Sequence, residues 1–175
     1  MSEQLILETG GPLGITGEPG SRVFTAAMPV RWSDQDLYHH VNHARMITLI
    51  EEARIPWLFE EGLPTASLTA GAVMTDLSVK YRGQVKHAEG PIRIRMWCEK
   101  VGGALFVARH EVRGRTTPDS APAAVDCTAR IAAFDLETQR PRRFTKAERD
   151  YLLDFVRSSK RGVIKPYVKR TASAE

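Results

Sequence analysis

Cysteine and long apolar runs are both scarce in this sequence. Its 175 residues include two cysteines, Cys98 and Cys127, which lie in apolar, strand-like stretches without metal-ligand spacing. We expect both to be buried, reduced core residues. No apolar run approaches the roughly 20 residues of a membrane span, and residues 1–4 lack the basic region and apolar core of a signal peptide. The sequence therefore predicts a cytoplasmic protein with no membrane span.

Composition points to an ordinary water-soluble globular domain. Apolar residues make up 42% and charged residues 26% of the chain, which is long enough for one domain with a hydrophobic core. The net charge of +4 is unevenly distributed: residues 140–175 carry 11 Lys and Arg against 4 Asp and Glu, whereas residues 1–139 carry 14 against 17. Such a segment can attract nucleic acid, a membrane or a phosphorylated ligand, but we favour a solvated terminal segment.

The ends of the chain differ from its middle. Residues 9–20 contain five glycines and two prolines, so they are not expected to hold a regular element. They lack the Gly-Lys-Ser/Thr ending of a phosphate-binding loop. We therefore expect a flexible arm over residues 1–20, one domain over 21–158 and a basic tail over 159–175.

The hydrophobic pattern predicts five strands and two helices. Alternating apolar residues place the strands at 22–32, 72–82, 91–99, 104–113 and 123–135. One long central helix is expected to follow the first strand and a short helix to follow the last one. This order predicts an α+β fold in which a five-stranded antiparallel sheet wraps around the long helix.

Capping residues predict where the helices begin and end. Asn42 is a good N-cap for the long helix, Gly62 is a plausible C-terminal cap, and Pro56 should kink this helix or interrupt its hydrogen bonds. The short helix is expected to begin at Thr145, whose spacing to Glu148 is that of a capping box.

The chemically richest stretch lies between the first strand and the long helix, from Arg31 to His43. It holds two carboxylates, three imidazoles and two amides. A strand would hold an acid rigidly, while a helix start offers unpaired N–H groups and the positive end of the helix dipole. An acid or base that faces such a helix start is the layout that acyl transfer or hydrolysis requires.

The residues of this junction resemble those of a known family. The Asp-x-Asp-x-x-x-His-Val-Asn pattern of Asp34–Asn42, followed by Ile50-Glu51-Glu52-Ala53-Arg54, resembles the hotdog-fold acyl-CoA thioesterases, in particular the 4-hydroxybenzoyl-CoA thioesterase and YbgC-like group. The resemblance covers about residues 22–157. It implies a hotdog fold and hydrolysis of an acyl-CoA to a carboxylic acid and free CoA, with no cofactor. It also implies a homodimer or homotetramer with active sites at the subunit interface.

The resemblance assigns catalytic roles to two residues. The family's catalytic carboxylate falls on Asp36, which would act as general base or nucleophile. The position seven residues later, His43, would polarise the thioester carbonyl with its ring and its backbone N–H. From the residues alone, Asp36 could instead cap the turn, and Asp34 competes with it for the catalytic role although a structural role suits Asp34 better. This chain has His39 where relatives often have Gly.

Further residues are candidates for substrate binding. His40 and Asn42 lie beside the catalytic pair, where shaping the turn and capping the helix are the competing roles. Arg82 and Lys100 are among the cations that could contact the phosphates of CoA. His39, His40 and His43 lack a helical His-Glu-x-x-His pattern, so no metal site is predicted.

Two other functions are open at this point. One is a non-catalytic acyl-CoA binding module, and the other is a hotdog enoyl-thioester hydratase or dehydratase. The acyl group, and the choice between CoA and a carrier protein, are not fixed by the sequence.

Overall fold

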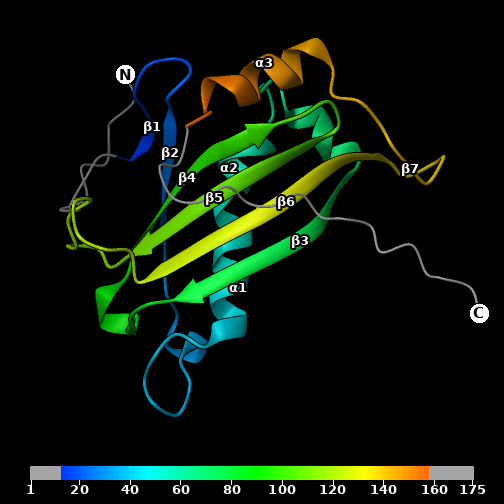
Figure 1. Cartoon of the computed structure of the whole chain (residues 1–175). Coiled ribbons are helices and arrows are strands. Elements are labelled where there is room, and N and C mark those ends of the chain that lie inside the picture. The colour runs from blue at the N-terminus through cyan, green and yellow to red at the C-terminus, as the bar shows by residue number, and fades with distance from the viewer. Residues whose placement is uncertain (1–12, 158–175) are drawn as a thin grey trace, which may run out of the picture.

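Seven strands form one antiparallel sheet in the structure, a computed structural model that describes residues 13–157 (Figure 1). They are β1 (Gly14–Thr16), β2 (Val23–Met28), β3 (Ala72–Tyr81), β4 (Ile92–Val101), β5 (Leu105–Arg113), β6 (Val125–Asp135) and β7 (Arg140–Pro141). Their order across the sheet is β1-β2-β4-β5-β6-β3, and β7 pairs with the end of β6. The five longer strands match the predicted ones, but the predicted total of five omits β1 and β7.

The short strand β1 lies in the segment that was expected to hold no regular element. Its Ile15 pairs with Phe24 of β2. Just beyond it, the N–H groups of Gly20 and Arg22 donate to the carbonyl of Asp154, at 2.8 and 3.0 Å. The expectation of an arm without regular structure is therefore wrong for Gly14–Thr16, because pairing with β2 outweighs the local glycine content. Residues 1–12 and the predicted tail 159–175 lie outside the described residues.

The predicted long helix is divided into α1 (His43–Ala53) and the single turn α2 (Ile55–Leu58). Pro56 has no N–H to donate to the preceding turn, which explains the break at Arg54. The predicted C-terminal cap at Gly62 is wrong, because α2 ends at Leu58 and Phe59 is its cap. The predicted N-cap is confirmed: the Asn42 side chain accepts a hydrogen bond from the N–H of Ala44 at 2.9 Å.

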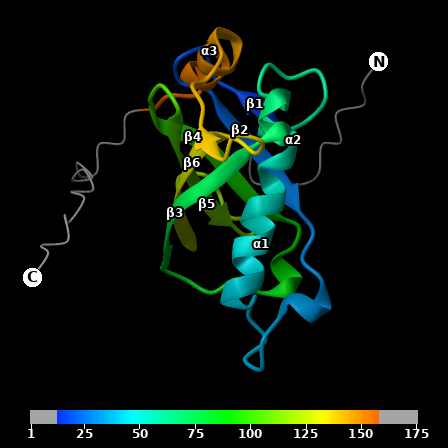
Figure 2. The same ribbon diagram turned by 90° about the vertical axis from the view of Figure 1, so that its right-hand side faces the viewer.

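The hydrophobic core lies between these helices and one face of the sheet (Figure 2). Alternate strand residues such as Ile94, Ala108 and Ala129 face Met46 and Ile50 of α1, and all five are buried. Cys98 and Cys127 are buried and free, as predicted. Burial raises the pKa of both thiols, that of Cys127 to about 11.

Three short 3₁₀ helices and one further α-helix connect or flank the strands: η1 (Trp32–Asp34), η2 (Ala66–Ala70), η3 (His87–Glu89) and α3 (Lys146–Asp154). The capping box at the start of α3 is confirmed, since Thr145 and Glu148 each bond the other's backbone. Within residues 13–157, no helix is long and apolar enough to cross a membrane.

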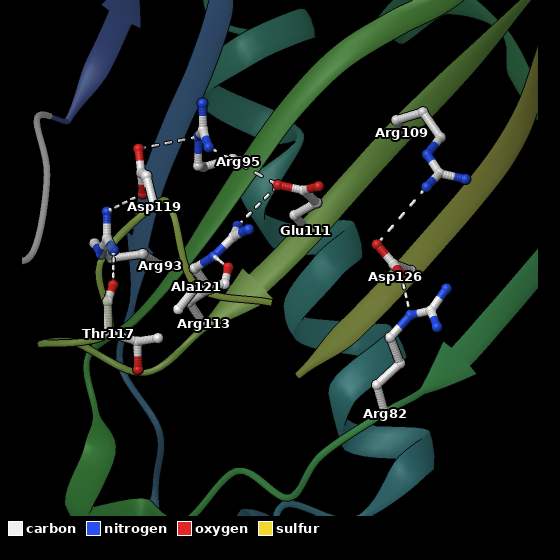
Figure 3. Close-up of polar contacts among 10 residues, drawn as sticks. All are labelled: Arg82, Arg93, Arg95, Arg109, Glu111, Arg113, Thr117, Asp119, Ala121 and Asp126. Carbon is white, nitrogen blue, oxygen red and sulfur yellow. Dashed lines mark hydrogen bonds and ion pairs between the residues drawn. The ribbon is translucent and has the colours of Figure 1, made fainter. Parts of the chain in front are cut away.

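The opposite face of the sheet carries a network of arginines and carboxylates (Figure 3). Arg93 is almost completely buried there, where it contacts the carbonyl of Thr117 and, at 2.8 Å, the carboxylate of Asp119. Glu111 pairs with Arg113 at 2.8 Å. The loop between β5 and β6 is thus fixed over one end of this face by charge-assisted hydrogen bonds.

Candidate active site

The junction between β2 and α1 is a loop whose base is closed by hydrogen bonds to Asp34. Asp34 is buried, and its Oδ2 accepts a hydrogen bond from the N–H of Arg31 at 2.7 Å. The carbonyl of Asp34 accepts a second bond, from the N–H of Asn42, at 2.8 Å. Asp34 therefore fixes the two ends of the loop, which is the structural role that the sequence favoured for it.

Asp36 forms the tight turn within this loop. Its Oδ1 accepts hydrogen bonds from the N–H groups of Tyr38, at 2.8 Å, and His40, at 3.2 Å. Desolvation opposes ionisation, but these two bonds and the nearby His40 outweigh it and lower the pKa of the Asp36 carboxyl below its usual range. Asp36 thus caps the turn, as its non-catalytic interpretation required, and it is also held as a half-exposed carboxylate that is ionised at neutral pH.

His39 occupies the position in this turn that needs a left-handed backbone. Its φ is 60°, a region in which glycine is unstrained and most other residues are uncommon. The turn closes through the N–H of His39, which donates to the carbonyl of Asp36 at 3.1 Å, and through the N–H of Asp36, which donates to the carbonyl of His40 at 2.8 Å. This chain therefore keeps the turn without a glycine.

The loop is also fastened to the segment that precedes β4. The N–H of Val41 donates to the carbonyl of Val85 at 2.7 Å, and the side chain of Gln35 accepts a long bond of 3.4 Å from the N–H of His87. Asp36 is consequently carried on a loop with anchors on both sides.

His43 is the first residue of α1 and its side chain is exposed. Within residues 13–157 no acceptor is present for its backbone N–H, which lies at the positive end of the helix dipole. Its carbonyl accepts a hydrogen bond from the hydroxyl of Tyr81, at 3.0 Å. The start of α1 is thereby tied to the end of β3.

The candidate binding residues fall into two groups. His40 and Asn42 lie in the junction itself, as described above. Arg82 follows β3 directly and donates to Asp126, which also pairs with Arg109 at 3.7 Å (Figure 3). Lys100 lies eight residues along β4 from Ile92, which pairs with Met28 next to the junction. That separation is roughly 26 Å at the rise of a strand, so the structure does not bring Lys100 to the junction of the same chain.

Several residues beside the junction were not singled out from the sequence. Trp32, Leu37 and Tyr38 are 74%, 95% and 78% exposed. All three lie within four residues of Asp36 in the chain and expose apolar surface. Tyr81 was identified only as one position in an alternating strand. Large apolar residues in an otherwise polar loop are the sequence signal that could have identified Trp32, Leu37 and Tyr38 as candidates.

A small cavity of about 80 Å³ lies between the base of the loop and α1. It is lined by Pro29, Arg31, Asp34, Arg45, Thr48, Leu49 and Glu52. Pockets for small molecules usually have volumes of about 300 Å³ or more, so this cavity does not hold an acyl group. Within the described residues no three His, Cys, Asp or Glu side chains gather to hold a metal ion.

Comparisons with known proteins point in one direction. A family model described as the thioesterase-like superfamily matches residues 30–154. No curated protein sequence gives a significant match. A protein described as a predicted thioesterase from Bacillus stearothermophilus has a similar structure, with a TM-score of 0.66 at 18% identity over 78% of this chain and 98% of that one.

Two further solved structures share the fold. A thioesterase from Thermus thermophilus, complexed with coenzyme A and Zn, gives a TM-score of 0.61 at 21% identity over 74% of this chain and 92% of that one. A DHNA-CoA thioesterase from Staphylococcus aureus gives 0.58 at 19% identity over 69% and 80%. At these identities the likeness shows a shared fold, in which an antiparallel sheet packs against a helix.

Proposed function

Because this chain belongs to the thioesterase-like superfamily of thioester hydrolases, we propose that it hydrolyses an acyl-CoA to a carboxylic acid and free CoA. Water supplies a hydroxyl group to the thioester carbonyl carbon, the carbon–sulfur bond breaks, and the thiolate leaves and takes up a proton. Two of the similar proteins, one bound to coenzyme A and one named for a CoA thioester, support CoA as the carrier. The hotdog fold and a place in the 4-hydroxybenzoyl-CoA thioesterase and YbgC-like group are part of this proposal.

The observation that carries the proposal is an ionised carboxylate on the loop that leads directly into a free helix start. Asp36 is the general base for water, or the nucleophile that attacks the thioester carbonyl. Its lowered pKa makes it a weak base but leaves it fully ionised, and this suits direct attack at least as well as base catalysis. Its Oδ1 is occupied by the turn, so Oδ2 is the oxygen that acts.

His43 is the polarising group of the proposed mechanism. Its backbone N–H, at the start of α1, donates to the thioester oxygen as negative charge develops there, and its exposed ring supplies a second contact. A thiolate leaves without prior protonation, so one carboxylate and these donors are sufficient. His40 and Asn42 position the substrate next to this pair.

Arg82 is the proposed partner for a phosphate of CoA. It follows Tyr81 at the end of β3, but its side chain pairs with Asp126 on the face of the sheet away from α1, so the phosphate would lie at the outer edge of the sheet. Its existing bond to Asp126 would hold the guanidinium in place while its remaining N–H groups bind phosphate. Lys100 is too far along β4 to bind at the same junction, so its proposed contact is with a substrate held by another copy of the chain.

We infer that the active form is a homodimer or homotetramer with its sites at the subunit interface. The ten-residue strand β3 is the outer strand of the sheet in the described part of the chain, and one of its edges is unpaired. Such an edge is a ready template for pairing with a second copy. The exposed Leu37 and Tyr38 and the small size of the nearby cavity fit a site that a partner completes. A cytoplasmic location fits the two free cysteines.

The test is thiol release from a panel of acyl-CoAs by the wild-type protein and by Asp36→Asn. Asparagine keeps the Oδ1 acceptor for Tyr38 and His40 but removes the negative oxygen, so the turn survives while the chemistry does not. We expect turnover by the wild type and a loss of at least about a hundredfold in kcat for the folded variant. His43→Ala keeps the backbone donor and should cost less.

Other outcomes would give the protein a different function. Tight acyl-CoA binding without thiol release by the wild type would indicate a binding module. Addition of water to an enoyl thioester, without free thiol, would indicate a hydratase. Full activity in Asp36→Asn would leave the function standing but overturn the assignment of the carboxylate.

A further inference from the structure

Two buried polar side chains lie between α1 and the sheet, and neither has a role in the site described so far. Arg54, at the break between α1 and α2, is 4% exposed, and His110 of β5 is 0% exposed. Within residues 13–157 the guanidinium Nη1 of Arg54 and both ring nitrogens of His110 are buried without a hydrogen-bond partner. Buried polar groups are almost always paired, so unpaired ones require an explanation.

The cost of this arrangement is electrostatic. Among the described residues the carboxylate nearest to Arg54 is that of Glu51, at 3.8 Å, which is too long for a hydrogen bond, and the Glu51 side chain is 67% exposed. Burial lowers the pKa of Arg54, and Glu51 compensates only in part. A buried cation without a close counter-ion destabilises a fold, so its presence indicates that something else pairs with it.

Arg54 and His110 form one cluster. Burial first, and then the positive charge of Arg54, lower the pKa of His110 to about 3, and the backbone of Cys127 opposes this shift only in part. His110 is therefore neutral at physiological pH and offers one N–H donor beside the guanidinium. A cation with free donors next to a neutral imidazole is complementary to a carboxylate.

The flank between α1 and β3 connects this cluster to the candidate active site. Along β3 the helix-facing residues Leu77 and Val79 are half-buried and Tyr81 is exposed, so this flank is open in the described chain. At one end Tyr81 contacts the carbonyl of His43. Two residues further in, Val79 pairs with Cys127, which pairs in turn with His110.

The length of this path limits the acyl group. His110 lies two strand residues, roughly 7 Å, beyond the level of Tyr81, and two strands, roughly 10 Å, across the sheet from β3. The backbone of Arg54 lies eleven residues along the helical segment from that of His43, a distance of roughly 16 Å. The Arg54 side chain points back toward the helix start. An acyl group of about six to ten carbons spans such a distance.

We propose that Arg54 and His110 bind a carboxylate at the far end of the substrate's acyl group, so that the preferred substrates are thioesters of dicarboxylic acids. This inference rests on the proposed thioesterase function. The acyl chain lies along the apolar flank between α1 and β3, with its thioester at His43 and its free carboxylate at Arg54. Binding supplies the counter-ion that the buried guanidinium lacks.

The test compares matched thioesters. We expect kcat/KM of the wild type for adipyl- and suberyl-CoA to exceed that for hexanoyl- and octanoyl-CoA by about tenfold or more. Arg54→Met, which keeps the length and apolar stem of the side chain, should lose this preference and change the values for the two monocarboxylic thioesters less than about threefold. Arg149→Met removes the same charge from an exposed position on α3 and should keep the preference.

A second measurement separates this inference from the proposed function. Calorimetric titration with the thioethers S-(5-carboxypentyl)-CoA and S-hexyl-CoA measures binding without hydrolysis. Tighter binding of the carboxylated thioether by the wild type, weakened in Arg54→Met, would support the carboxylate site even if no acyl-CoA is cleaved.

Three results would overturn the carboxylate site. One is equal binding of both thioethers by the wild type. Another is a wild-type preference for the monocarboxylic thioesters. The third is an Arg54→Met variant that loses all substrates equally together with a fall in Tm, since that pattern belongs to a purely structural arginine. If Arg54→Met does not fold, Arg54→Lys replaces it and should retain part of the preference.

Discussion

At the scale of single residues, the environment of Asp36 determines how activity depends on pH. Because the hydrogen bonds to its carboxylate lower its pKa below the ordinary 3.8, Asp36 is ionised above that pH and loses its charge only below it. We expect kcat/KM to show no acid limb from Asp36 above about pH 4. A pH–rate profile checks this. An acid limb above about pH 5 that moves in Asp36→Glu would contradict it.

Glu148 predicts a second pH effect, on stability. This buried carboxylate accepts two bonds from Arg142, at 2.9 and 2.7 Å, and one each from Ser67 and the N–H of Thr145, both at 2.7 Å. Burial alone would raise the pKa of Glu148, but these bonds lower it to about 2. Since the folded state favours the carboxylate, its stabilisation is complete above about pH 4.5 and is lost as the pH falls toward 2.

The matching substitution is Glu148→Gln. We expect it to lower the free energy of unfolding at pH 7 by about 2–4 kcal/mol and to flatten the acid part of the stability curve. Urea denaturation between pH 2 and pH 7 measures both effects. Glu61→Gln, at an exposed position, is the control. Equal pH slopes in the wild type and Glu148→Gln would show that other carboxylates dominate acid unfolding.

At the scale of elements, the start of α1 depends on its cap. The Asn42 side chain satisfies the N–H of Ala44, so Asn42→Ala should destabilise the protein by about 1 kcal/mol. Asn42→Asp keeps the acceptor and should be close to neutral. Thermal unfolding compares the two variants. A loss of stability as large in Asn42→Asp as in Asn42→Ala would mean that the amide N–H₂ matters, not the cap.

The longer elements were predictable because their patterns are local. Alternation located all five long strands, and Asn42 and Thr145 marked two helix starts correctly. The strands β1 and β7 were missed because three and two residues carry no readable period, and their pairing is set by β2 and β6. The end of the helical segment was placed too late because a glycine past a helix is also common in the loop that follows.

The sequence predicts where the candidate site lies in the chain but not which hydrogen bonds form within it. The junction loop follows from a strand that leads into a capped helix. The bonds of Asp36 to Tyr38 and His40 depend on the left-handed backbone at His39, which a non-glycine residue gives no reason to expect. The isolation of Arg54 and His110 depends on which strands and helices cover them, and one sequence does not reveal that.

At the scale of the whole molecule, the unpaired edge of β3 predicts how two copies meet. Ser78 is exposed near the middle of this strand. In a two-fold pairing of β3 with itself, Ser78→Glu brings two like charges close together, so the dimer should dissociate severalfold more readily than the wild type. Ser78→Thr is the neutral control. Sedimentation velocity measures both, and a wild type that is monomeric at micromolar concentration would contradict the proposed dimer.

The bonds from Gly20 and Arg22 to Asp154 bring the segment between β1 and β2 next to the end of α3, on the side of the molecule away from the loop between β2 and α1 (Figure 1). A flexible peptide linker could therefore join residue 157 to residue 13, which keeps β1 paired with β2, without crossing the active site. The chain could then be reopened at Gly102-Gly103, in the hairpin between β4 and β5. Such a circular permutant should fold and release thiol at a rate close to that of the natural order, because the join and the new opening both lie away from the loop that carries Asp36.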